Sequence, residues 1–280
     1  MLFPARAGVI LVSAFTVFAI PAFPRTCGGD PIPSCSGTPE GTAAFKNRVD
    51  NPRKSGIIEI EEGSSSNDIE WLSKGERIST DEYKELRDYA ASKGISLSGF
   101  RTSDVDTDLI RESINSITEV TAVFPELMGT GRKNLTLSLS YTMRANDFAS
   151  SDMRISHIIE LNGNAFRNAA KLEEEYQKLV KDRWFVQGTS RKSIVKHELG
   201  HLYQSIHGLS DKEVVDIALR ASNLDSPMRL FDYLSDNLSL YSASYLDGSE
   251  IISEVFSDYF TNATPTDFSK KFIEELTKMR

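Results

Sequence analysis

Hydrophobic residues recur with regular spacing only from about residue 80 onward, and most of that spacing is helical. Apolar positions three or four residues apart predict seven helices, over 80–94, 106–123, 164–181, 190–207, 211–221, 249–260 and 265–278. End signals support several of them, because Thr80 is a predicted N-cap, Gly208 a predicted stop, and Ser210 with Glu213 a predicted capping box.

A small sheet is predicted ahead of the helix over 190–207. Strict alternation over 134–141 predicts a strand with one apolar face, formed by Leu135, Leu137, Leu139 and Tyr141. The segment 155–162 predicts a second, less regular strand. Because helices dominate and the strands cluster in one stretch, the predicted fold class is α+β.

Composition divides the chain into segments 1–35, 36–77 and 78–280. An almost uncharged apolar run over 7–23, with Ala22 as the candidate cleavage point, indicates a signal peptide and is too short for a spanning helix. Residues 36–77 are rich in Ser, Gly, Pro and charge, which predicts a flexible linker. The remainder is the predicted folded domain.

A second interpretation of residues 1–35 comes from the codons that can encode them. FPARAGVI (3–10) and FPRTCGGDP (23–31) can be translated from one nucleotide stretch read in two frames, and the GC-rich inverted repeat in that stretch resembles a CRISPR repeat. The segment is then a translated repeat and not an export signal. If the segment is an export signal, Cys27 and Cys35 could form a disulfide outside the cell. If it is a translated repeat, the two cysteines have no role.

Charge and cysteine content exclude several classes of protein. The chain has 32 Lys and Arg against 40 Asp and Glu, a net charge of −8, and no basic block, which argues against nucleic-acid binding. Two cysteines are too few for a disulfide framework or a cysteine-rich zinc cage.

The motif HELGH at 197–201 is the strongest chemical signal in the sequence. On a helix, His197 and His201 lie about 40° apart in rotation, so both imidazoles can bind one metal ion. Zinc suits two imidazoles and one carboxylate, with a further position open for water. Glu198 lies beside them and could accept the proton of a water activated by the metal.

The third ligand could follow closely in the sequence. His207 has the spacing of the third histidine in metzincins, but that pattern needs a glycine where Gln204 stands. With the helix continuing, His207 lies about 240° of rotation from His201, so a helix-end role is favoured. His157, alone in a predicted strand, is interpreted as structural.

A carboxylate stripe offers the other choice. In SEIISEVFSDYF, Glu250, Glu254 and Asp258 lie four residues apart on one helical face, among apolar residues that indicate a buried helix. Stacked carboxylates repel unless a cation compensates them. In metal sites one such carboxylate binds the ion and the next orients a ligand histidine.

HELGH followed by a helix of form E-x-x-small-E-x-F resembles the gluzincin-type zinc peptidases, most closely the catalytic domain of the anthrax lethal factor group. The stretch from about 80 to 280 also resembles metallopeptidase-like domains of phage minor head proteins. The resemblance implies a zincin-like domain in which Glu250 is the third ligand and Glu254 orients a histidine. A thermolysin-like register fits Glu254 and Asp258 instead. We prefer Glu250, which begins the helix.

The family also has a tyrosine shortly before the third ligand that stabilises the tetrahedral oxyanion. Tyr245 and Tyr241 are the candidates here, and Tyr245 is the preferred one. The resemblance implies a zinc-dependent metalloendopeptidase that acts on a protein or peptide substrate, with no stable membrane span in the mature domain. By fold analogy, the strand over 135–141 or 155–161 is expected to pair with an extended substrate.

Two other classes of function remain open. One is a catalytically silent, phage-head-associated interaction domain that keeps a structural metal site. The other is a secreted effector or toxin protease. The protein is secreted if residues 1–22 are a genuine signal peptide, and otherwise cytoplasmic or associated with a phage particle.

Replacing Glu250 by Ala should remove zinc from the purified protein, because a carboxylate ligand is lost, whereas His207→Ala should leave zinc in place. Metal content measured by mass spectrometry tests both variants, with His197→Ala as the control that loses zinc in either case. Zinc retained without Glu250 and lost without His207 would favour the metzincin ligand set.

Overall fold

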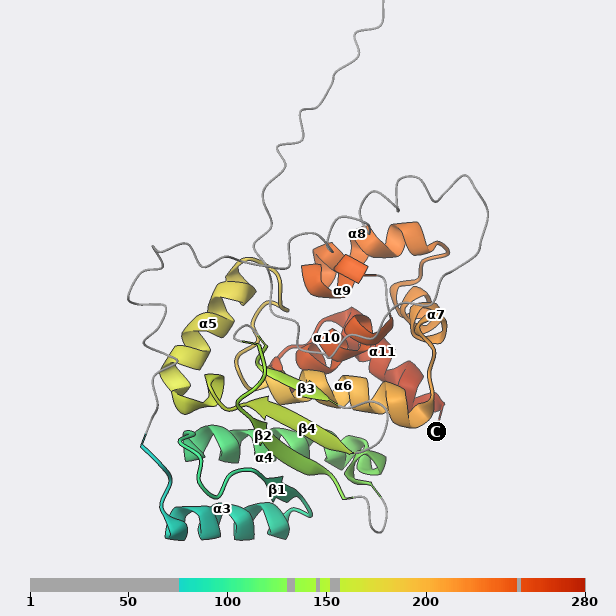
Figure 1. Ribbon diagram of the computed structural model, residues 1–280. Coiled ribbons are helices and arrows are strands. Elements are labelled where there is room, and N and C mark those ends of the chain that lie inside the picture. The colour runs from blue at the N-terminus through green and yellow to red at the C-terminus, as the bar shows by residue number, and fades with distance from the viewer. Residues whose placement is uncertain (1–75, 130–133, 145–146, 152–156, 246–247, 280) are drawn as a thin grey trace, which may run out of the picture.

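The computed structural model describes residues 76–129, 134–144, 147–151, 157–245 and 248–279. The predicted N-terminal segment and almost all of the predicted linker, with Cys27 and Cys35, lie outside the described residues. The described part is mixed α+β and mostly helical, with one small sheet (Figure 1). This confirms the predicted α+β class.

The sheet that the described residues form contains four strands in the order β1-β2-β4-β3. They are β1 (Ser96–Ser98), β2 (Thr136–Ser140), β3 (Ala149–Ser151) and β4 (Ile158–Asn162). β1, β2 and β4 are parallel, whereas β3 runs antiparallel to β4. Alternate residues of the central strands are buried against the helices, which places the core on one face: Leu137, Leu139, Ile159 and Leu161.

The helices of the described residues pack around this sheet and around each other. They are α3 (Thr80–Ser92), α4 (Thr107–Val123), α5 (Ala169–Lys181), α6 (Ser193–His207), α7 (Asp211–Ser222), α8 (Pro227–Asn237), α9 (Leu240–Tyr245), α10 (Gly248–Thr261) and α11 (Asp267–Lys278), with short 3-10 turns at Pro125–Met128 and Ala165–Arg167. All seven predicted helices are present. None of the helices in the described ranges is long and apolar enough to cross a membrane.

Local hydrogen bonds explain where helix ends differ from the prediction. Ser79, not Thr80, caps α3, because its hydroxyl accepts from the Glu82 N–H in a capping box. The helix predicted over 164–181 is interrupted at Asn168, whose side chain caps α5. α6 begins at Ser193 without a side-chain cap, and the hydroxyl of Thr189 donates to the carbonyl of Val186.

Four elements were not predicted from the sequence. β1 and β3 are only three residues long and rich in serine, so their apolar alternation is too short to detect. α8 and α9 fall in a stretch left unassigned. Pro227 at the start of α8, with Leu230 and Leu234 buried one turn apart, was the signal that could have found it.

The strand topology corrects the expected substrate edge. β2 lies between β1 and β4, and β4 lies between β2 and β3, so neither central strand has a free edge for an incoming peptide. The prediction that the strand over 135–141 or 155–161 pairs with substrate is therefore wrong. Among the described strands the edges are β1 and β3, and β3 is the one that packs beside α6.

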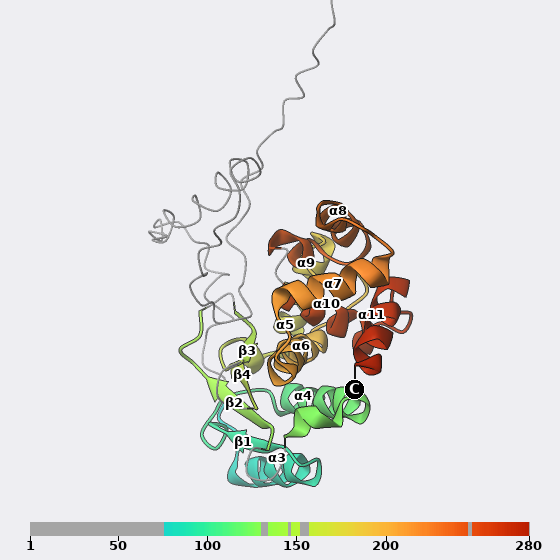
Figure 2. The ribbon, with the colours of Figure 1, turned by 90° about the vertical axis from the view of Figure 1, so that its right-hand side faces the viewer.

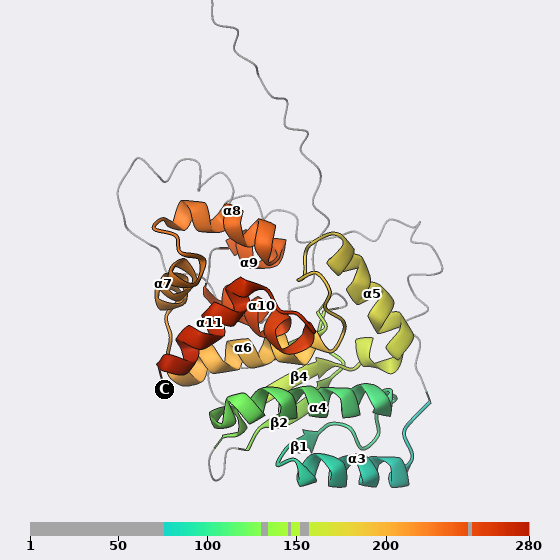
Figure 3. The same cartoon turned by 180° about the vertical axis from the view of Figure 1, so that it is seen from behind.

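α6 lies between the sheet and the C-terminal helices (Figures 1 and 2). It packs on α4 and β3 on one side and most extensively on α10 on the other. The rings of Phe124, Tyr203 and Phe256 meet where α4, α6 and α10 come together, with centroid separations of 4.9–5.7 Å. Figure 3 shows α4, α6 and α10 stacked in that order from behind. This packing fixes α6, and with it the HELGH motif, in the middle of the molecule.

A buried polar cluster ties the loop before α4 to the end of β2. Asp104 accepts a 2.6 Å hydrogen bond from the Tyr141 hydroxyl and pairs with Arg167 at 2.9 Å. Burial raises the pKa of Asp104, but the hydrogen bonds from Tyr141 and Arg167 and the arginine charge outweigh it, so the pKa is lowered overall. Tyr141 was predicted to share the buried face of β2, but it follows the strand and is 39% exposed.

Asp104→Asn should lower the free energy of unfolding at pH 7 by about 1.5–3 kcal/mol, because hydrogen bonds to a buried charge are lost. The folded-state pKa lies below the unfolded value, so this stabilisation is present above about pH 4 and disappears as the pH falls through the folded-state pKa. Urea unfolding at a series of pH values measures it. The control Asp88→Asn removes only the exposed pair with Arg87 and should show no such pH dependence.

Candidate metal centre

The metal-ligand candidates of HELGH lie on the buried part of α6. Every residue from Ser193 to Gln204 is buried, including the ionisable side chains of Glu198 and His201, which have no solvent exposure. The helix ends at Gly208, which adopts a left-handed conformation with φ of 61°. One turn separates His197 from His201, so both imidazoles project towards α10.

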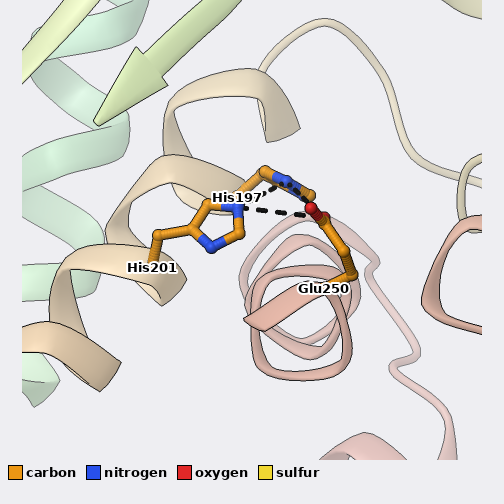
Figure 4. A group of neighbouring side chains, drawn as sticks. All are labelled: His197, His201 and Glu250. Atoms are coloured by element: carbon orange, nitrogen blue, oxygen red, sulfur yellow. Dashed lines mark hydrogen bonds and ion pairs between the residues drawn. The ribbon is translucent and has the colours of Figure 1, made fainter. Parts of the chain in front are cut away.

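A backbone contact between α6 and α10 brings the third candidate into place. A Cβ atom at Gly200 would lie 2.6 Å from the Cα atom of Ser253, so glycine is required for the helices to approach this closely. Ser253 is fully buried at the same crossing. One turn earlier on α10, Glu250 faces the two imidazoles (Figure 4).

The three side chains converge on one point. The Nε2 atoms of His197 and His201 are 3.1 Å apart, and Oε2 of Glu250 lies 3.3 Å from the first and 3.8 Å from the second. Ligands held at about 2.0–2.1 Å in a tetrahedron lie about 3.3 Å from one another. The spacing and the two-imidazole, one-carboxylate donor set therefore fit a tetrahedral ion such as zinc.

Glu254 lies behind the imidazole of His197 and not among the converging atoms. Its Oε1 is 3.0 Å from Nδ1 of His197, the ring nitrogen that faces away from Glu250. Asp258 accepts hydrogen bonds from the backbone and side chain of Thr266 at the start of α11. The structure thus groups Glu250 with the imidazoles, in the preferred register, and places Glu254 where it can hold the orientation of the His197 ring.

Burial and charge act in opposite directions on the two imidazoles. Burial lowers the pKa of His197, but Glu250 and Glu254 outweigh it and raise the value to about 10. Burial also lowers the pKa of His201, there to about 3, because the charge of Glu250 compensates only in part. The pKa of Glu250 is lowered, since the two imidazoles and a hydrogen bond from Tyr241 outweigh its burial.

Glu198 is a buried carboxylate beside the converging atoms. Burial raises its pKa to about 8, and the charge of His197 and the hydroxyl of Ser151 oppose that shift. Neither carboxylate oxygen has a hydrogen-bond partner of standard geometry among the described residues. A buried, poorly solvated carboxylate at this place can exchange a proton with a small molecule that enters the site.

Of the two candidate tyrosines, the structure brings Tyr241 to this group. Its ring stacks on that of His197, with centroids 5.8 Å apart and planes 15° from parallel, and its side chain helps to lower the pKa of Glu250. The side chain of Tyr245, the preferred candidate from the sequence, lies outside the described residues, although its backbone ends α9. The spacing to Glu250 in the sequence therefore favoured Tyr245, whereas the contacts that the structure describes belong to Tyr241.

The remaining histidines lie apart from the converging atoms. His207 stacks on Tyr203, with ring centroids 4.2 Å apart, and its Nε2 lies 3.2 Å from Oε1 of Glu126. Gln204 continues α6 as predicted, so His207 sits near the C-terminal end of the helix. His157 precedes β4, where its carbonyl accepts from the Thr136 N–H.

Comparisons with models of protein families, with curated proteins and with solved structures find no match to this chain. The resemblance to gluzincin-type peptidases and to phage-associated metallopeptidase-like domains therefore stays a prediction from the sequence.

Gly200→Ala should lower the free energy of unfolding by about 1–3 kcal/mol, because the added methyl group meets the backbone of α10. It should also weaken Zn²⁺ binding, since Glu250 moves away with α10. Urea unfolding and Zn²⁺ titration measure the two effects.

The matched control is Gly208→Ala on the same helix. A Cβ at Gly208 has no neighbour within 4 Å but a φ of 61°, so this variant should cost stability through its backbone while leaving Zn²⁺ affinity unchanged. Equal effects of both variants on Zn²⁺ affinity would show that the helix contact does not set the site.

Proposed function

We propose that this chain is a zinc-dependent metallopeptidase that hydrolyses internal peptide bonds of a protein or peptide. One observation carries the proposal: His197, His201 and Glu250 present three ligand atoms within 4.8 Å of one another, and the charges of His197 and Glu250 act on the buried Glu198. A site with three protein ligands keeps a position for a reacting molecule, as catalytic zinc sites do.

The ligand set would consist of Nε2 of His197, Nε2 of His201 and a carboxylate oxygen of Glu250. When bound, zinc supplies Lewis acidity, which polarises the scissile carbonyl and lowers the pKa of the attacking water. Glu254 accepts the Nδ1 proton of His197, which leaves Nε2 free as a ligand and holds the ring in place.

Glu198 is the proposed general base. Its carboxylate takes a proton from the attacking water and then passes it to the nitrogen of the leaving amine. Because this carboxylate is buried, bulk water does not screen it, and its interactions with charges in the site are stronger. The hydroxyl of Tyr241, or that of Tyr245, stabilises the oxyanion of the tetrahedral intermediate.

An extended substrate would lie along β3. This strand is an edge of the described sheet, runs antiparallel to β4 and packs beside α6, so added backbone hydrogen bonds would hold a peptide next to HELGH. The hydroxyl of Ser151, at the end of β3, lowers the pKa of Glu198. It thereby connects that edge of the sheet to the proposed base.

Glu198→Gln tests the assignment most directly. The amide keeps the volume of the side chain but accepts no proton, so we expect stoichiometric Zn²⁺ and a fall in kcat of at least about 100-fold. Cleavage of a mixed peptide library, read by mass spectrometry, and metal analysis of the same preparations measure both quantities.

The His201→Ala variant provides the control, because it should lose both Zn²⁺ and cleavage. Full activity of Glu198→Gln would remove Glu198 from its proposed role. Zn²⁺ bound by the wild-type protein without any cleavage would favour the alternative of a structural metal site in an interaction domain.

A further inference from the structure

The loop between α5 and α6 forms hydrogen bonds with the first residues of α9. Arg183 and Trp184 follow directly after α5, and Leu240 and Tyr241 begin α9. The Leu240 N–H donates to the Arg183 carbonyl at 2.9 Å, and the Tyr241 N–H donates to the Trp184 carbonyl at 3.1 Å. Figures 1 and 3 show this loop and α9 side by side.

The Arg183 side chain also forms hydrogen bonds with the C-terminal end of α8. Its Nη2 donates to the carbonyl of Ser235 at 2.5 Å and to that of Asp236 at 3.2 Å. These are among the last carbonyls of the helix, where a positive charge is favoured by the helix dipole. The residue is exposed, yet its backbone has a φ of 59°, which is uncommon for a side chain of this size.

The same loop packs around the Tyr241 ring. Trp184 lies against it with centroids 5.6 Å apart, and Phe185 meets it edge-on at 6.0 Å. The same ring also reaches the metal-ligand candidates, because it stacks on His197 with centroids 5.8 Å apart, and its side chain helps to lower the pKa of Glu250. Tyr241 is therefore held between the loop and the proposed metal centre.

We propose that Arg183 is a positioning residue that holds Tyr241 against His197 and Glu250. Its guanidinium fixes the C-terminal end of α8, and its carbonyl fixes the first turn of α9, so the phenol is presented in one orientation. Arg183 itself touches none of the ligand candidates in the contacts described, and it acts through Tyr241. The consequence for metal binding rests on the proposed function, whereas the positioning of Tyr241 does not.

The test replaces Arg183 without disturbing its backbone. Asn tolerates the left-handed conformation, so Arg183→Asn removes the guanidinium alone. Zn²⁺ affinity of the full chain, measured by competition with a chromophoric chelator, should fall by about tenfold, the lower end of the effect of residues that orient metal ligands. Arg183→Lys, which can still donate to both carbonyls, should restore most of the affinity.

Arg220→Asn is the matched control. Arg220 is another exposed arginine, which bridges α7 to Glu275 of α11 at 3.1 Å, and its loss should leave Zn²⁺ affinity unchanged. If Arg183→Asn binds Zn²⁺ as tightly as the wild type, or if Arg220→Asn weakens it equally, the inference is wrong.

A second readout needs no metal. The chain has two tryptophans, Trp71 and Trp184, so in a Trp71→Phe background the emission comes from Trp184 alone. In the metal-free protein, Arg183→Asn should increase acrylamide quenching of that emission and shift it to longer wavelength, and Arg183→Lys should reverse both changes. Unchanged quenching overturns the inference. A wild-type protein that binds no Zn²⁺ but shows the quenching change would overturn the proposed function and retain the positioning role.

Discussion

The structure depends on one constraint, the burial of three carboxylates and two imidazoles where α6 meets α10. Glu198, Glu250 and Glu254 are almost completely removed from solvent, although burying a charge without a partner is costly. The cost is reduced because His197 lies between Glu250 and Glu254, at 3.3 Å and 3.0 Å. Burial raises the pKa of Glu198 to about 8, so this carboxyl carries little charge at neutral pH, and a divalent cation at the converging atoms would favour its ionised form. The contact at Gly200 favours this arrangement, because it lets the backbones of α6 and α10 approach closely at their crossing.

The rest of the fold keeps that helix pair fixed. The sheet and α4 support one side of α6, and the rings of Phe124, Tyr203 and Phe256 close the core between α4, α6 and α10. On the other side, α8 and α9 are irregularly connected and contribute Tyr241 to the site. Rigid helices therefore carry the ligand candidates, whereas a shorter helix held by loop contacts carries the phenol. Metal ligands must be positioned to a fraction of an ångström, and long packed helices hold side chains more accurately than loops do.

The sequence predicts the parts of this site that follow from helical periodicity. The positions of His197, Glu198 and His201 relative to one another depend only on residues per turn, and the same holds for Glu250 and Glu254. The choice between those two glutamates depends on how α10 crosses α6. This crossing cannot be predicted from the spacing of residues within either helix. The contact of Gly200 with Ser253 decides it, because the face of α10 that meets α6 then presents Glu250 to Nε2 and Glu254 to Nδ1. The choice of Tyr241 over Tyr245 could not be made from the sequence either, since the placement of Tyr241 depends on hydrogen bonds to Arg183 and Trp184, more than fifty residues earlier.

The burial of Glu198 favours the proposed reactive site over a purely structural one. A structural zinc site is closed by four protein ligands, whereas the converging group in the described residues consists of three. A carboxylate added beside such a group purely for stability would be expected to find hydrogen-bond donors. Glu198 instead has two buried oxygens without a partner of standard geometry in the described part of the chain, and its pKa is raised by that burial. Fold stability alone would favour an apolar side chain of similar size at this position. A carboxylate kept in this unfavourable setting, next to three candidate metal ligands, is the arrangement that the proposed hydrolysis by an activated water requires.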